Sequence, residues 1–222
     1  LALALADCGA DVAIHYHSSA EEAAATAGEA RDRGVKATTV QADVTDPESV
    51  DGAFDDVETE LGSVDVLVNN VGDFAPEHWE EIDLGTWNRV LSTNLTGTML
   101  CSRRALPGMR EAEWGRIVNV GYASSDRAMV GATNFPYFVA KTGVLMFTRM
   151  LAADTQDDGI TVNAVSPYVI ETSDEFPEEA PRGRWATVED VANAALFFCG
   201  SDSDYVSGEN VEIDGGWLPE SI

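Results

Sequence analysis

A tyrosine and a lysine stand four residues apart in this chain, at Tyr137 and Lys141. On a helix these positions share one face, so the ammonium of Lys141 can lie near the phenol of Tyr137. A phenol normally titrates near pH ~10, and a fixed positive charge favours its ionised form. The pair could therefore act as a general acid or base at neutral pH, although the same spacing also suits an ordinary surface pair. Lys36 is the only other lysine in the sequence.

Asparagine, glycine and serine motifs elsewhere in the sequence also suit a ligand site. Side-chain amides and hydroxyls can hold a ligand or a water molecule, and glycine lets the backbone approach a ligand closely. The segments with these properties are Asp43-Val44, Asn69-Asn70-Val71-Gly72, Asn94-Leu95-Thr96-Gly97, Ser124-Ser125, Asn163-Ala164-Val165-Ser166-Pro167 and Ile170-Glu171-Thr172.

Short apolar runs alternate with longer helical stretches, and this order predicts the fold. The predicted strands are Val12–Tyr16, Lys36–Gln41, Val64–Asn69, Arg116–Val120, Thr161–Val165 and Asn210–Ile213. The predicted helices are Ala20–Arg33, Pro47–Leu61, Leu84–Met109, Phe135–Asp154 and Val188–Cys199. Alternating strands and helices indicate an α/β protein with a Rossmann-like, doubly wound parallel sheet. Ligands of such sheets bind at the carboxyl ends of the strands, where several of the motifs lie.

The beginning of the chain departs from this pattern. Leu1–Asp7, followed by Gly9, resembles the last turns of a helix, whereas a dinucleotide-binding sheet opens with a strand and a glycine-rich turn. We therefore expect residues 1–222 to form a single NAD(P)-binding domain that lacks its first strand and glycine-rich turn, as a fragment of a longer protein would. The motifs named above resemble those of the short-chain dehydrogenase/reductase family, in which the missing strand lies between the strands equivalent to Val12–Tyr16 and Val64–Asn69. By this resemblance those two strands should not be hydrogen-bonded to each other, and the chain should bind NADPH poorly.

From Val12 onward the chain resembles the short-chain dehydrogenase/reductase family, and in particular its 3-oxoacyl-carrier-protein reductase branch. The resemblance rests on motifs that occur in the family's order. They are the Asn69–Gly72, Asn94–Gly97, Tyr137–Lys141, Asn163–Pro167 and Ile170–Thr172 segments, followed by Tyr205-Val206-Ser207-Gly208 and Asp214-Gly215-Gly216. The resemblance implies an oxidoreductase that interconverts a carbonyl and a secondary alcohol of a small molecule. It also implies a homo-oligomer, either a dimer or a tetramer.

By this resemblance Asn94, Ser124, Tyr137 and Lys141 form the catalytic set. Tyr137 would transfer the proton, Lys141 would lower its pKa and hold the ribose, and Asn94 would hold a water that links Lys141 to solvent. The family's serine, which bonds the substrate oxygen, has alternative positions here. Counting thirteen residues back from Tyr137 gives Ser124, with Ser125 beside it, whereas alignment from the preceding strand puts Tyr122 there.

The segment after the first visible strand, His15–Ser19, predicts the choice of cofactor. An NAD enzyme usually has an acidic residue there to bond the ribose 2′-hydroxyl, and this segment has none. We therefore expect NADP(H) rather than NAD(H), with His17 near the 2′-phosphate and His15 in packing. Asp43 could instead be a turn or capping residue. The full set of expected cofactor-binding residues is His17, Ser18, Ser19, Asp43, Val44, Asn69, Gly72, Tyr137, Lys141, Pro167, Ile170 and Thr172.

Composition excludes several kinds of partner. With 39 acidic and 13 basic residues the net charge is −26, which disfavours nucleic acids and anionic membranes. Such an acidic surface resembles the proteins of salt-loving microbes, in which salt screens the repulsion. Three cysteines without CxxC spacing suggest neither a disulfide framework nor a zinc site, and no metal is expected. No signal peptide or membrane-length apolar run is visible, so cytoplasm is the expected location.

Two functional hypotheses follow from the sequence. The first is the NADP(H)-dependent oxidoreductase described above, for which an acyl thioester, a sugar, a pteridine or a small ketone would be a suitable substrate. The second is a catalytically silent Rossmann-type scaffold for binding or oligomerisation, suggested by the displaced serine and the missing glycine turn. The intact set of Asn94, Tyr137 and Lys141 favours the first hypothesis.

Overall fold

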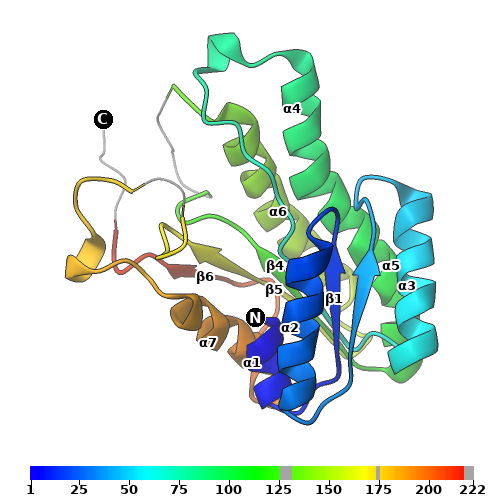
Figure 1. Cartoon of the computed structure of the whole chain (residues 1–222). Helices are drawn as coiled ribbons and strands as arrows, with labels where there is room; N and C mark the ends of the chain where they lie inside the picture. The colour runs from blue at the N-terminus through cyan, green and yellow to red at the C-terminus, as the bar shows by residue number, and fades with distance from the viewer. Residues whose placement is uncertain (126–131, 174–175, 218–222) are drawn as a thin grey trace.

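The computed structural model describes residues 1–125, 132–173 and 176–217, and in it parallel strands lie between helices (Figure 1). The helices are α1 (Ala2–Asp7), α2 (Ala20–Asp32), α3 (Pro47–Leu61), α4 (Leu84–Leu91), α5 (Gly97–Ala112), α6 (Phe135–Asp154) and α7 (Val188–Cys199). The strands are β1 (Val12–Tyr16), β2 (Ala37–Gln41), β3 (Val66–Asn69), β4 (Gly115–Val120), β5 (Ile160–Pro167) and β6 (Asn210–Ile213). The predicted α/β class and the six predicted strands are confirmed, with small shifts at strand ends.

The strands form two parallel sheets within the described residues. β1 pairs with β2, and β3, β4, β5 and β6 pair in that order. β1 and β3 share no ladder, as the sequence led us to expect, and a cavity of about 930 Å³ lies between them. Its lining includes Val12–His15 from β1 and Val64–Asn69 from the β3 side. That residues 1–222 are a fragment lacking the first strand and glycine-rich turn of a longer protein stays a prediction.

Helices cover both faces of the strands, which explains why the strands are apolar without alternation. On one face α1, α2 and α7 pack in buried clusters that include Val12, Val118 and Phe198. On the other face α3, α5 and α6 enclose a cluster that contains Met109 and Ile117. Within the part of the chain that the structure describes, no helix is both long and apolar enough to cross a bilayer.

Local sequence signals fix the helix ends as predicted. The side chain of Asp46 accepts a hydrogen bond from the amide of Glu48 ahead of α3, and the helix stops at Gly62, whose φ is 93°. Thr187 and Asp190 form a reciprocal capping box at the start of α7. These caps orient two of the helices that pack on the sheet.

The single helix predicted over Leu84–Met109 is interrupted, so that prediction was wrong in one respect. A π-helical turn, Ser92–Thr96, separates α4 from α5. Within it the amide of Asn94 donates to the carbonyl oxygen of Val90 at 2.9 Å, so a side chain bonds a carbonyl one turn back. Such turns occur often at functional sites, and this one holds a motif residue.

Candidate active site

Tyr137 and Lys141 lie on one face of α6, beside the carboxyl end of β4. The Nζ of Lys141 donates to the carbonyl oxygen of Val120 at 2.7 Å, which ties the helix to the last residue of the strand. The same Nζ lies 5.5 Å from the centroid of the Tyr137 ring. On its other side Tyr137 meets the ring of Tyr122 edge-on, with centroids 5.7 Å apart. The predicted pair therefore sits at the ligand-binding edge of the sheet.

The protonation of this pair differs from the sequence expectation. Burial, followed by the charge of Tyr122, raises the pKa of Tyr137 above its ordinary value, whereas we expected Lys141 to lower it. Burial also lowers the pKa of Lys141 to about 8, because an ammonium loses its hydration when it is buried. The Lys141 ammonium donates its hydrogen bond to the carbonyl oxygen of Val120, and burial is the largest influence on the pKa of the phenol. Tyr137 is thus a neutral phenol at pH 7 and is suited to donating a proton.

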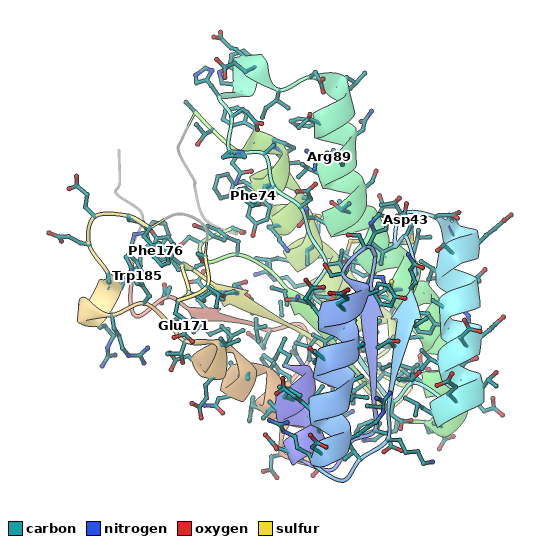
Figure 2. The ribbon with its side chains drawn as sticks, in the orientation of Figure 1. Asp43, Phe74, Arg89, Glu171, Phe176 and Trp185 are labelled. Carbon is teal, nitrogen blue, oxygen red and sulfur yellow. The ribbon has the colours of Figure 1, made fainter. Side chains whose placement is uncertain are left out.

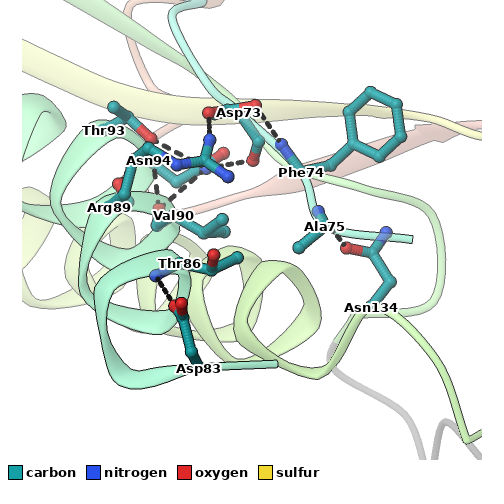
Figure 3. Close-up of polar contacts among 10 residues, drawn as sticks. All are labelled: Asp73, Phe74, Ala75, Asp83, Thr86, Arg89, Val90, Thr93, Asn94 and Asn134. Carbon is teal, nitrogen blue, oxygen red and sulfur yellow. Dashed lines mark hydrogen bonds and ion pairs between the residues drawn. The ribbon is translucent and has the colours of Figure 1, made fainter. Parts of the chain in front are cut away.

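Asn94 is 1% exposed and holds its amide between two carbonyl groups. Its Nδ2 donates to Asp73 O at 2.7 Å and to Val90 O at 2.9 Å, as Figure 3 shows. Its Oδ1 has no hydrogen-bond partner among the described residues. A buried acceptor without a partner is costly, and a water molecule or ligand can satisfy it. This acceptor therefore fits the water-holding role that the family resemblance assigns to Asn94.

The loop after β3 is held against Asn94. A Cβ atom added to Gly72 would approach the Asn94 Oδ1 to 2.3 Å, so only glycine fits there without a shift. The next residue, Asp73, forms an ion pair with Arg89 of α4, and Ala75 N donates to Asn134 Oδ1 at 3.0 Å (Figure 3). These contacts fix the backbone of the loop at the edge of the candidate site. The Asp73–Arg89 pair was not found from the sequence.

The three candidates for the oxygen-binding residue occupy different surroundings. Ser124 is fully buried at a φ of 63°, and its amide donates to Glu212 Oε1 at 2.7 Å. Ser125 is also buried, and its hydroxyl donates to the carbonyl oxygen of Tyr122 at 2.6 Å. Tyr122 is only partly buried, and its ring contacts the ring of Tyr137.

Two of the expected cofactor-binding residues form hydrogen bonds with other residues of the protein. Asn69 is buried, and its Nδ2 donates to Asn119 Oδ1 at 2.8 Å and to Ser102 Oγ at 3.1 Å. The exposed Asp43 accepts bonds from the hydroxyl and the amide of Thr45, which hold its pKa below the usual range. Asp43 thus forms the bonds of a turn residue, as in the alternative considered from the sequence, and its side chain is also exposed at the strand end.

The remaining expected cofactor residues are spread along the carboxyl edge. His17, Ser18 and Ser19 are exposed just after β1, whereas His15 Nε2 lies 2.9 Å from Ala42 O, in packing. Val44 is buried against Gly97, where an added Cβ would lie 2.8 Å from the valine Cγ2. Pro167, Ile170, Val120 and Asn69 all line the 930 Å³ cavity, and Thr172 is exposed beyond it.

The segment after β5 forms the opposite side of the site from the β3 loop. In Figure 2, Glu171, Phe176 and Trp185 lie on this side, away from Phe74 and Arg89. Glu171 N donates to Ala186 O at 2.8 Å, and its side chain accepts from the first amide of α7. The rings of Phe176 and Trp185 pack together at 5.5 Å. The chain after β5 is thus attached to α7.

An aromatic group that sequence analysis missed lies at this edge. Tyr168 stacks on Trp217 with centroids 4.0 Å apart, and it meets the ring of Tyr122 at 6.2 Å. A sequence signal for the group does exist. Tyr122 follows β4, Tyr168 follows β5 and Trp217 follows β6, and these neighbouring parallel strands end at the same edge.

Comparisons with known proteins agree with this arrangement. A family model described as enoyl-(acyl carrier protein) reductase matches residues 1–218. A 3-oxoacyl-[acyl-carrier-protein] reductase from Aquifex aeolicus is 35% identical, over 96% of this chain and 89% of that protein. Nodulation protein G from Azospirillum brasilense is 32% identical, over 96% of this chain and 90% of that protein.

Solved structures of related proteins have the same fold. The structure of a putative gluconate dehydrogenase from Agrobacterium tumefaciens matches with a TM-score of 0.89 and 34% identity, covering 97% of this chain and 88% of that one. A gluconate 5-dehydrogenase from Burkholderia cenocepacia, solved with NADP and tartrate, matches with a TM-score of 0.88 and 30% identity over the same shares.

Proposed function

This chain belongs to the short-chain dehydrogenase/reductase family and is an oxidoreductase of carbonyl and alcohol groups, and we propose that it reduces a ketone to a secondary alcohol with NADP(H). The observation that carries the proposal is the pair on α6. Tyr137 is kept as a neutral phenol by burial, so it is ready to give its proton to a carbonyl oxygen that gains negative charge. The silent-scaffold alternative is set aside because the relatives are enzymes and the catalytic pair is intact.

The residues at the carboxyl edge fit a nicotinamide dinucleotide. Gly72 keeps the β3 loop close to Asn94, whose Oδ1 is a buried acceptor that no other described residue satisfies. Lys141 and Tyr137 would hold the nicotinamide ribose, Val44 and Asp43 the adenine, and the exposed His17–Ser19 segment the 2′-phosphate. When bound, the dinucleotide supplies the hydride.

Three residues of the catalytic set, Asn94, Tyr137 and Lys141, would each take part in the proton transfer. Tyr137 donates its phenol proton to the substrate oxygen, and its phenolate is then stabilised by the ammonium of Lys141, 5.5 Å from the ring. Lys141, with a pKa of about 8, can pass a proton to Tyr137 near neutral pH. A water held by the Oδ1 of Asn94 would return the proton to Lys141 from solvent.

An exposed apolar stripe supports the proposal that the protein is a homo-oligomer. Val139, Met146 and Met150 of α6 are 50%, 61% and 66% exposed. Their spacing of seven and four residues places them on one face of the helix, where a second copy could cover them. Contact between two such faces would leave the pair Tyr137 and Lys141 at the sheet edge.

The test compares Tyr137→Phe with wild-type protein. The substrate panel contains a 3-oxoacyl thioester, a keto-sugar acid and a small diketone, and NADPH oxidation is followed. We expect kcat to fall by about 10²–10⁴-fold in the variant, because its general acid is gone, while NADPH binding by fluorescence stays within about threefold. Tyr205→Phe is the matched control, because Tyr205 is fully exposed. Full turnover by Tyr137→Phe would mean that another group gives the proton.

A further inference from the structure

We propose that Tyr122 holds the substrate oxygen in this protein, in the place where the resemblance assigns a serine. The inference rests on the proposed function and adds a second phenol to it. Tyr122 lies two residues after the end of β4, and the Nζ of Lys141 is hydrogen-bonded to Val120, the last residue of that strand. The tyrosine therefore projects from the same strand end that anchors the catalytic lysine.

Three aromatic neighbours fix the ring of Tyr122 beside Tyr137. Tyr137 meets it at 5.7 Å and 76°, Phe138 at 5.5 Å and 59°, and Tyr168 at 6.2 Å and 61°. Tyr168 is itself stacked on Trp217. Edge-to-face and tilted contacts of this kind favour one orientation of the ring. A hydrogen-bond donor that is held in place before the reaction is what stabilisation of a developing oxyanion needs.

Neither serine has surroundings that suit this task. Ser124 is fully buried, and its backbone is joined to Glu212 of β6, on the side of the loop that packs against the sheet. Ser125 uses its hydroxyl to bond the Tyr122 carbonyl oxygen, and its own carbonyl accepts a bond from Thr142 Oγ1 at 2.7 Å. The two serines thus shape the turn that presents Tyr122.

In the proposed role Tyr122 donates a hydrogen bond and transfers no proton. Burial and the neighbouring Tyr168 raise the pKa of Tyr122 to about 12, so it stays a neutral donor across the working range. Its O–H donates a hydrogen bond to the substrate oxygen. This hydrogen bond becomes stronger as hydride reaches the carbonyl carbon, because the C=O π pair then moves onto the oxygen. The proton that completes the alcohol comes from Tyr137, and Tyr122 keeps its own.

The test uses Tyr122→Phe, which removes the hydroxyl and keeps the ring. Wild type, Tyr122→Phe, Ser124→Gly and the surface control Tyr205→Phe are assayed on whichever ketone of the panel the wild type reduces. Glycine is chosen at position 124 because it tolerates the positive φ while removing the hydroxyl. Thermal unfolding and NADPH fluorescence titration are measured for each variant, so that a folding or cofactor effect is seen separately.

We expect Tyr122→Phe to lower kcat by about 10²-fold, the usual effect of losing one oxyanion donor, with NADPH affinity and unfolding temperature unchanged. If Tyr122→Phe keeps the wild-type kcat, or if Ser124→Gly shows the large loss of kcat instead, the assignment of Tyr122 is overturned. The proposed function is left standing in either case. A wild-type protein that reduces no ketone in the panel contradicts the proposed function, and the assignment of Tyr122 with it.

Discussion

Replacing Lys141 by methionine should make the protein more stable while abolishing its activity. The Lys141 side chain is 4% exposed, and burial lowers its pKa from 10.5 to about 8. At about 1.36 kcal/mol per pH unit, holding this lysine in the charged form at pH 7 costs the folded state about 3 kcal/mol. Methionine has a similar length and carries no charge, so Lys141→Met removes this cost.

A hydrogen bond that the variant cannot form opposes this gain. The Nζ of Lys141 donates to Val120 O at 2.7 Å, and leaving this part-buried carbonyl oxygen without that donor costs about 1–2 kcal/mol. The net expectation is a gain of about 1–2 kcal/mol in the free energy of unfolding at pH 7. Lys36→Met is the matched control, because Lys36 is the other lysine and is exposed, so its replacement should change stability by less than about 0.5 kcal/mol.

The pH dependence of the free energy of unfolding is a second measure of the same effect. Between pH 8 and 10.5 the unfolded chain keeps the Lys141 proton while the folded chain releases it, so wild-type stability rises with pH. Lys141→Met lacks this rise, and the difference between the two proteins should shrink from pH 7 to pH 10. Equilibrium urea unfolding at both pH values, at fixed salt, measures it. A Lys141→Met protein that is less stable than wild type at pH 7 would refute the reasoning.

Two further predictions concern the surface and the cofactor. The unfolding temperature should rise between 0.1 and 3 M KCl, because salt screens a net charge of −26, and a flat or falling temperature would contradict the salt-adapted interpretation. Steady-state kinetics should give a lower KM for NADPH than for NADH, since His15–Ser19 has no acidic residue. Ser18→Asp should reverse this order by repelling the 2′-phosphate, and equal use of both cofactors by the wild type would count against the prediction.

Most of the fold was predictable because its signals are local. The apolar runs became the six strands, and caps such as Asp46 and Thr187 fixed helix starts where they were expected. The π-helical turn was not predictable, because Ser92–Thr96 is compatible with continuous helix. It depends on bonds from Asn94 to the Val90 and Asp73 carbonyl groups, and Asp73 lies twenty-one residues away.

The candidate site was predictable in its residues and less so in its electrostatics. The spacing of Tyr137 and Lys141 correctly indicates proximity, but a spacing carries no information on burial. In the structure burial dominates, and it raises the pKa of Tyr137 while lowering that of Lys141. Counting residues likewise could not show whether Ser124 or Tyr122 binds the substrate oxygen. That depends on the direction of each residue in the loop, where Ser124 is bonded to Glu212 and Tyr122 contacts Tyr137.

Lys141 is a buried lysine in a chain whose basic residues are mostly arginine, and the chemistry proposed for the site explains why a lysine stands there. Of the 13 basic residues only Lys36 and Lys141 are lysines, so arginine carries most of the positive charge. Arginine stays protonated in proteins, which suits ion pairs but not the return of a proton to Tyr137. A buried lysine with a pKa of about 8 can both hold and release a proton near neutral pH. On the proposed function, this position needs lysine for a titration that arginine cannot perform, and the cost in stability predicted for Lys141 accompanies that chemistry.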